Sequence, residues 1–177
     1  MFQRGLTPPD PFGDQSPLEQ ARSQDDMSLQ TFADLGQVLV VFLPALGGVF
    51  CRELLARIES LRPEVERRGV RLALVHMGDD DEARAEFERY ELQYVARVAD
   101  PERVLHRHFD LAEASALQHF RPTVIGRALG AARHGRGPVV GSGNQLHGAV
   151  LLERDHEPRV QRATARGEPL ELMALID

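Results

Sequence analysis

One uninterrupted apolar run, QVLVVFL at residues 37–43, constrains the fold of this chain more than any other feature. It shows no alternation of polar and apolar residues, which is typical of a strand buried on both faces in a parallel sheet. The run ends at Pro44, and Gly47 and Gly48 then precede the only cysteine, Cys51. We therefore expect an α/β protein in which a buried strand turns through a glycine-containing loop into a helix.

The spacing of the apolar residues changes at the cysteine. Helical spacing places six residues on one face of a predicted helix: Cys51, Leu54, Leu55, Ile58, Leu61 and Val65. Arg52 falls on the opposite, charged face, where we expect it to contact solvent. A glycine then ends the helix, and a second buried strand follows at Val70 to Met77.

The segments that flank this unit complete its first half. Residues 27–36 are predicted as a short strand and turn that lead into the first buried strand. Residues 79–92 begin with acidic side chains, which favour a helix N-terminus. A weaker strand is expected at 93–100, and a short helix at 101–111 with Pro101 in its first position.

The last third of the chain predicts an insert and a hairpin. Residues 114–137 form an arginine-rich helical segment that Pro122 starts or kinks. Residues 146–164 alternate as a β-hairpin with its turn at Asp155 to Pro158, and 169–176 make a C-terminal amphipathic helix. The order predicts an α/β fold: a central mixed sheet, parallel at first and antiparallel at its end, flanked by helices.

Composition limits the class of protein. Residues 1–26 carry four prolines among polar residues and are predicted as a proline-rich arm before a single domain at 27–177. A net charge of −6 argues against nucleic-acid binding, and no segment predicts a membrane span or a signal peptide. One cysteine excludes an internal disulfide, so we expect a cytoplasmic protein. The scattered histidines form no zinc pattern, and we expect neither a metal nor a cofactor.

The position of Cys51 allows two interpretations. At the start of a helix, unpaired N–H groups and the helix dipole stabilise a thiolate, which is the nucleophilic form. Cys51 also begins the apolar face of that helix, and free cysteine is among the most buried residue types. The residues themselves leave a reactive thiol and a core thiol both open.

Three segments of the sequence resemble a known family. They are MSLQTFADLGQVLVVFLPALGGVFCREL, ADPERVLHRHFDL and GNQLHGAVLLERDHEPRVQRATARGEP, and the likeness runs from Met27 to the C-terminus. Together they resemble the peroxiredoxin-like (alkyl hydroperoxide reductase/thiol-specific antioxidant) redoxins of the thioredoxin-fold superfamily. The resemblance implies a thioredoxin-like fold with the arginine-rich insert placed before the final hairpin and helix.

The active-site motif of that family is degenerate here. Pro44, Gly48 and Cys51 follow the spacing of the peroxiredoxin Pro-x-x-x-Thr/Ser-x-x-Cys loop, with glycine in the hydroxyl position. In the related Cys-x-x-Cys pattern, Gly48 replaces the first cysteine and Cys51 is the second. His147 lies where thioredoxins carry a cis-proline and many peroxiredoxins carry a nearby arginine, and it is a weak auxiliary or a solvated hairpin residue.

The resemblance implies one-cysteine thiol chemistry at Cys51, with a hydroperoxide or small thiol as substrate and an external thiol as reductant. A second implied role is peroxide sensing, in which Cys51 forms a mixed or intersubunit disulfide without turnover. A homodimer is a further expectation. The alternative is a noncatalytic binding or scaffold module of the same fold. Arg52 and Arg121 are candidates for the missing arginine, and Arg121, Arg127, Arg133 and Arg136 form either an anion-attracting surface or a solvated helix face. An accessible thiol beside a free cation favours chemistry, whereas a buried sulfur among aliphatic groups favours binding.

Overall fold

A five-stranded mixed sheet forms the centre of the computed structural model, which describes residues 16–114, 122–135 and 137–177. The strand order is β3-β2-β1-β4-β5. The strands are β1 (Val38–Phe42), β2 (Arg71–His76), β3 (Ala96–Ala99), β4 (Gly148–Leu152) and β5 (Arg159–Arg162). β1, β2 and β3 pair in parallel, whereas β4 and β5 add as an antiparallel hairpin. The predicted mixed sheet with its terminal hairpin is confirmed.

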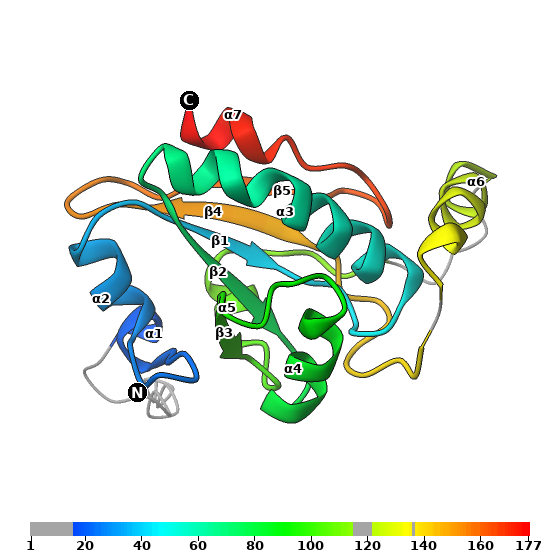
Figure 1. The fold of residues 1–177 in the computed structure, drawn as a ribbon, viewed down its shortest axis with the longest axis horizontal. Coiled ribbons are helices and arrows are strands. Elements are labelled where there is room, and N and C mark those ends of the chain that lie inside the picture. The colour runs from blue at the N-terminus through cyan, green and yellow to red at the C-terminus, as the bar shows by residue number, and fades with distance from the viewer. Residues whose placement is uncertain (1–15, 115–121, 136) are drawn as a thin grey trace, which may run out of the picture.

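β1 is buried on both faces, as its sequence predicts. Leu39 and Val41 pack in one apolar cluster, together with residues of α3 (Val49–Arg67), α4 (Asp80–Glu88) and α7 (Leu172–Ile176). Val38 and Val40 pack in a second cluster with residues of α2 (Leu29–Asp34) and α5 (Val104–His108). Figure 1 shows α3 and α7 on one side of the sheet and α2 with α1 (Pro17–Gln20) on the other.

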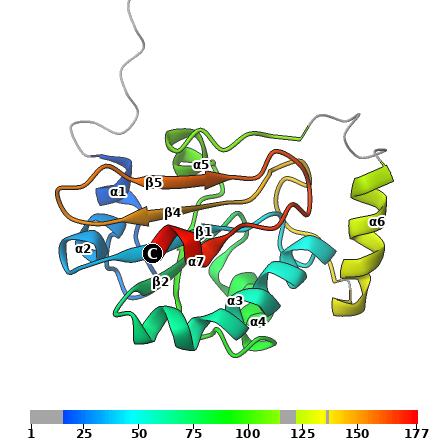
Figure 2. The same cartoon turned by 90° about the horizontal axis from the view of Figure 1, so that it is seen from above.

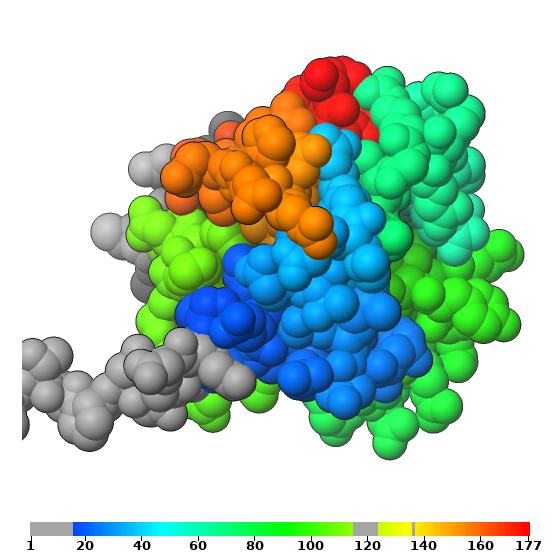
Figure 3. All heavy atoms as spheres, turned by 90° about the vertical axis from the view of Figure 1, so that its left-hand side faces the viewer, coloured from blue at the N-terminus to red at the C-terminus, as the bar shows by residue number. Residues whose placement is uncertain are grey.

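The N-terminal segment lies against the edge of the sheet. Ser23 forms an isolated antiparallel bridge with Val98 of β3, and the Gln24 amide donates to the Arg97 carbonyl oxygen at 3.2 Å. Figure 3 shows this N-terminal part in blue beneath the orange hairpin. The first fifteen residues of the predicted arm lie outside the described residues.

The prediction of a strand at 27–36 is wrong, because this segment contains α2. The Ser28 hydroxyl accepts a hydrogen bond from the Thr31 amide at 3.1 Å and caps the helix N-terminus. Leu29 and Ala33, four residues apart, then face the core. A serine that caps the backbone, followed by apolar residues four apart, is typical of a helix N-terminus, and this local pattern outweighs the expected strand.

The insert forms a separate helix at one end of the molecule. α6 (Pro122–Ala131) begins at the predicted proline and continues into a short 3-10 turn, η2 (Ala132–His134). Figures 1 and 2 show α6 beside the N-terminal end of α3 and apart from the two helical layers. No helix in the described part of the chain is long and apolar enough to cross a membrane.

The buried ring of His76, at the end of β2, predicts a pH-dependent stability. Its Nδ1 lies 3.0 Å from the Gly78 carbonyl oxygen, its Nε2 has no partner, and burial lowers its pKa to about 4. The folded state therefore favours the neutral ring. We expect the free energy of unfolding to fall as the pH drops from about 6.5 to about 4, by on the order of 3 kcal/mol, and no further contribution below that.

Urea unfolding of the wild type and of His76→Leu at several pH values checks this expectation. Protonation of carboxylates lowers the free energy of unfolding of both proteins in the same pH range. Only the difference in the free energy of unfolding between the two proteins therefore reports on His76. Parallel curves for the two proteins would show that His76 does not contribute.

Candidate functional site

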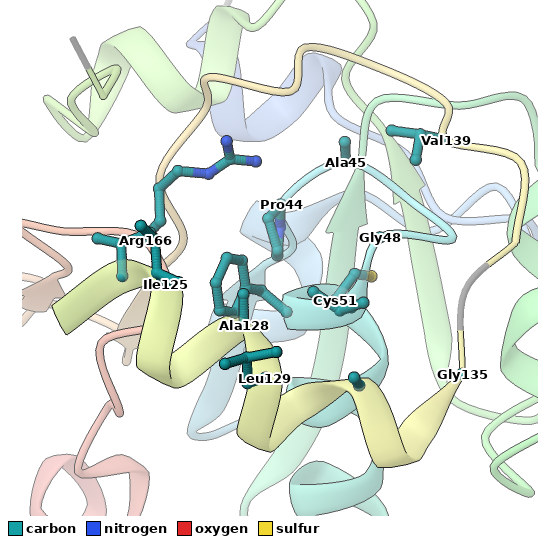
Figure 4. A pocket seen from close by; sticks show the side chains of 14 residues that line it. Pro44, Ala45, Gly48, Cys51, Ile125, Ala128, Leu129, Gly135, Val139 and Arg166 are labelled. Carbon is teal, nitrogen blue, oxygen red and sulfur yellow. The ribbon is translucent and has the colours of Figure 1, made fainter. Parts of the chain in front are cut away.

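The end of β1 places Cys51 at the edge of a cavity. The strand ends at Phe42, and α3 begins at Val49 with Gly48 as its N-cap residue. Cys51 therefore lies in the first turn of α3. Pro44, Gly48 and Cys51 all border one cavity of about 530 Å³ (Figure 4), so the structure brings together three of the four site residues that the sequence predicts.

Other walls of this cavity come from segments far away in the sequence. α6 contributes Val124, Ile125, Ala128 and Leu129, and the following loop contributes Val139. Arg166 reaches the cavity from the loop between β5 and α7 (Figure 4). The lining is thus mostly aliphatic with a single cationic side chain, which is the usual composition of a small-molecule site.

Glycine at position 47 permits the loop to close against the insert. Gly47 has φ +73°, and a Cβ there would collide with the Pro138 carbonyl oxygen. The Gly137 amide donates to the Gly47 carbonyl oxygen at 3.0 Å, and Leu46 and Val140 exchange two backbone hydrogen bonds. The chain that follows α6 is therefore fixed directly beside the loop that precedes Cys51.

The thiol itself is buried and protonated. Cys51 borders the cavity, yet its exposed fraction is 0%. Burial raises its pKa well above the ordinary value, and the negative charge of Glu86 raises it further. A backbone hydrogen bond from Gly47 and the charge of Arg52 lower the pKa by less. Cys51 is therefore a neutral thiol at pH 7, because the cost of burying a thiolate exceeds the help of the helix N-terminus.

Arg52 does not face solvent, and that prediction is wrong. Its exposed fraction is 7%, and its Nε and Nη2 donate to the two carboxylate oxygens of Glu86 at 2.5 and 3.2 Å. The Arg52 side chain is long enough to reach α4, and its guanidinium can be buried because a carboxylate of α4 pairs with it. No local sequence pattern predicts a pair between two helices. Because Glu86 neutralises it, Arg52 is no free cation for a thiolate.

His147 belongs to a different cavity. It is 5% exposed, so the solvated-ring interpretation does not hold, and its Nε2 donates to the Glu168 carbonyl oxygen at 2.5 Å. Burial lowers the pKa of the ring. It lines a neighbouring cavity of about 360 Å³ with Phe50 and Arg127, and it does not border the Cys51 cavity. Its hydrogen bond therefore fixes the loop between β5 and α7.

Sequence reasoning missed Phe50, Arg166 and the apolar face of α6. The face had a signal: Val124, Ala128 and Ala132 recur every four residues among the arginines of the insert. Arg127 and Arg133 are exposed, which fits a solvated face. Arg121 and Arg136 lie outside the described residues. Arg166 had no signal, because it stands in an irregular loop.

Comparison with known proteins shows the fold. No family model and no curated protein matches this sequence. The solved structure of the bacterioferritin comigratory protein of Xanthomonas campestris matches at 13% identity and a TM-score of 0.58, over 85% of this chain and 82% of that one. AhpC of Mycobacterium bovis matches at 15% identity and 0.52, over 86% and 69%.

A mutant of peroxiredoxin 6 from Arenicola marina matches at 12% identity and a TM-score of 0.59, over 88% of this chain and 66% of that one. The chain therefore has the thioredoxin-like fold seen in peroxiredoxins, as the sequence predicts. At these identities the likeness shows the fold alone.

The Arg52–Glu86 pair predicts how the Cys51 thiol responds to a charge change. In Glu86→Gln the carboxylate no longer raises the pKa of Cys51, while Arg52 still lowers it. We expect a lower thiol pKa and faster alkylation by iodoacetamide between pH 7 and 9, with a loss of stability on the order of 1–3 kcal/mol. Mass spectrometry of the native protein at each pH measures the rate.

Glu88→Gln is the matched control, because Glu88 is an exposed carboxylate on the same helix. Arg52→Gln breaks the same buried pair and so controls for the lost stability, and it should be alkylated more slowly than Glu86→Gln, since it removes the charge that favours the thiolate. Identical rate profiles for the wild type and Glu86→Gln would contradict this account of the thiol.

Proposed function

We propose that this protein is a noncatalytic binding module of the thioredoxin-like fold and that its ligand is a small apolar molecule held in the Cys51 cavity. The observation that carries the proposal is the pairing of a largely aliphatic cavity of about 530 Å³ with a buried, protonated thiol. Cavities of this size and lining accommodate small molecules. A neutral thiol in such a wall acts as a small apolar group.

The surroundings of the thiol support binding over chemistry. Gly48 caps α3 without a side chain, so it offers no hydroxyl group to align a substrate. Arg52, the cation that directly follows Cys51 in the sequence, forms an ion pair with Glu86. An efficient thiol nucleophile needs thiolate character and donors that stabilise the transition state.

A cavity-filling variant tests the binding proposal. Decanol titrated into the wild type is expected to bind and raise the melting temperature. In Ala128→Phe the ring occupies the cavity, and displacing about 60 Å² of apolar ligand surface weakens binding about tenfold. Calorimetric titration measures the affinity for decanol of the wild type and of each variant. Gly126→Phe is the control, because Gly126 lies on α6 but does not border the cavity. Equal affinity in all three proteins would place the ligand elsewhere.

A second function, one-cysteine redoxin chemistry at Cys51, is favoured by the position of the thiol in the first turn of α3 beside the cavity. One solved neighbour, the bacterioferritin comigratory protein of Xanthomonas campestris, has alkyl peroxide reduction activity, which supports this candidate. The thiol would attack the peroxide O–O bond, forming a sulfenic acid and releasing the alcohol. An external thiol would then form a mixed disulfide with loss of water, and a second external thiol would attack that bond, releasing the Cys51 thiol and a disulfide of the two external thiols.

In this second proposal Pro44 and Gly48 shape the loop, and His147 acts as an auxiliary only if it leaves Glu168. A reducing cytosol would keep the single thiol free. The cytoplasmic location and the homodimer, both expected from the sequence, stay predictions.

Native peroxide reactivity tests the second function. The protein is exposed to dilute hydrogen peroxide and then to a sulfenic-acid trap, with Cys51→Ser as control, and intact mass is followed against time and pH. The buried neutral thiol predicts slow labelling that accelerates on unfolding. Fast labelling of the folded wild type, with a thiol pKa below the free value of about 8.5, would establish the redoxin and displace the binding proposal.

A further inference from the structure

Among the described residues that line the Cys51 cavity, one side chain is charged, and it has no carboxylate partner. Arg166 is partly buried at the cavity edge, and no carboxylate among the described residues forms an ion pair with it. Its guanidinium carbon lies 5.8 Å from the centre of the Phe50 ring. A guanidinium stacked on an aromatic ring keeps its in-plane N–H groups free for an anion.

The loop fixes Arg166 in this position. Gly167 has φ +67°, and a Cβ there would collide with the Phe50 ring. The loop backbone therefore packs directly against the first turn of α3, and Arg166 is held beside the cavity by its neighbour. Figure 4 shows its side chain on the side of the cavity where Pro44 lies. Burial lowers the pKa of the Arg166 guanidinium.

Part of the apolar lining of this cavity is exposed to solvent. The described residues include five large hydrophobic side chains that are exposed, and three of them border this cavity: Ile125 at 48%, Leu129 at 73% and Val139 at 55%. Such a concentration of exposed apolar side chains marks a binding site. The lining residues include no carboxylate, so the cavity has a cationic end and an apolar wall.

We propose that the ligand of this cavity is an apolar monocarboxylate, with its carboxylate on Arg166 and its hydrocarbon part against the apolar face of α6. This inference rests on the proposed binding function and names the chemical class of its ligand. A guanidinium and a carboxylate form a charge-assisted, two-point contact, which fixes the head group. The apolar part covers the exposed side chains of α6, which supplies affinity.

Paired ligands and paired variants test this inference. Decanoate and decanol share a hydrocarbon chain and differ in the head group, so calorimetric titration of both at fixed ionic strength isolates the charge. In Arg166→Gln we expect decanoate to bind about tenfold more weakly and decanol to bind as before. Arg159→Gln removes the same charge from an exposed position on β5 and should change neither affinity.

Leu129→Glu probes the apolar wall. The added carboxylate should repel decanoate more than decanol, at an exposed position where the fold is not at stake. Circular dichroism confirms that each variant is folded before titration.

The outcomes separate the ligand class from the binding function. Tighter binding of decanoate than of decanol, lost in Arg166→Gln alone, supports the inference. Equal binding of the two ligands, unaffected by Arg166→Gln, keeps the cavity as an apolar site and overturns the carboxylate. Failure of both ligands overturns the binding function together with the inference. If neither ligand binds and the wild type forms a dimer that Leu129→Glu disrupts, a second copy of the chain occupies the cavity. That result would overturn the carboxylate inference.

Discussion

β1 positions the loop and the helix that carry Cys51 beside the cavity. It pairs in parallel with β2 on one edge and antiparallel with β4 on the other, and all five of its residues have an exposed fraction of 0%. A shift of one residue would move each apolar side chain to the opposite face and break both pairings, so the register is fixed. Where β1 ends, the loop from Pro44 to Gly48 must begin, and α3 must start beside it. The location of Cys51 follows from the sheet.

The state of Cys51 is decided by a competition between burial and charge. A helix N-terminus stabilises an anion by roughly 0.3–1 kcal/mol, whereas removing a charge from water costs several kcal/mol. The buried Arg52 could offset that cost, but Glu86 holds it and adds a negative charge of its own. The same place in the fold that favours a thiolate in an open site therefore holds a neutral thiol here. Its contribution is to the apolar wall of the cavity.

The cavity exists because three distant segments meet. The first turn of α3, α6 and the loop before α7 all contribute to its lining, together with the loop after β1 and Val139, and Arg166 is the one cation among the described lining residues. The hydrogen bonds between the 46–47 and 137–140 segments hold the insert in place, and Gly47 and Gly167 allow the backbone to come close on either side. A cationic end and an apolar wall in one cavity are complementary to a ligand with an anionic head and an apolar body.

The sequence by itself determined the sheet, most helices and the place of the cysteine. The run at 37–43 predicted a strand buried on both faces, and the helical spacing from Cys51 predicted the core face of α3. It failed at α2, where a serine cap and apolar residues four apart form a helix in place of the predicted strand. Only the tertiary structure decided that Arg52 pairs with Glu86, that His147 binds the Glu168 carbonyl oxygen, and that Arg166 faces Cys51's cavity. Periodicity reports how a residue relates to its own strand or helix, whereas these partners lie on other elements, and the charge and burial at a site depend on where those elements pack.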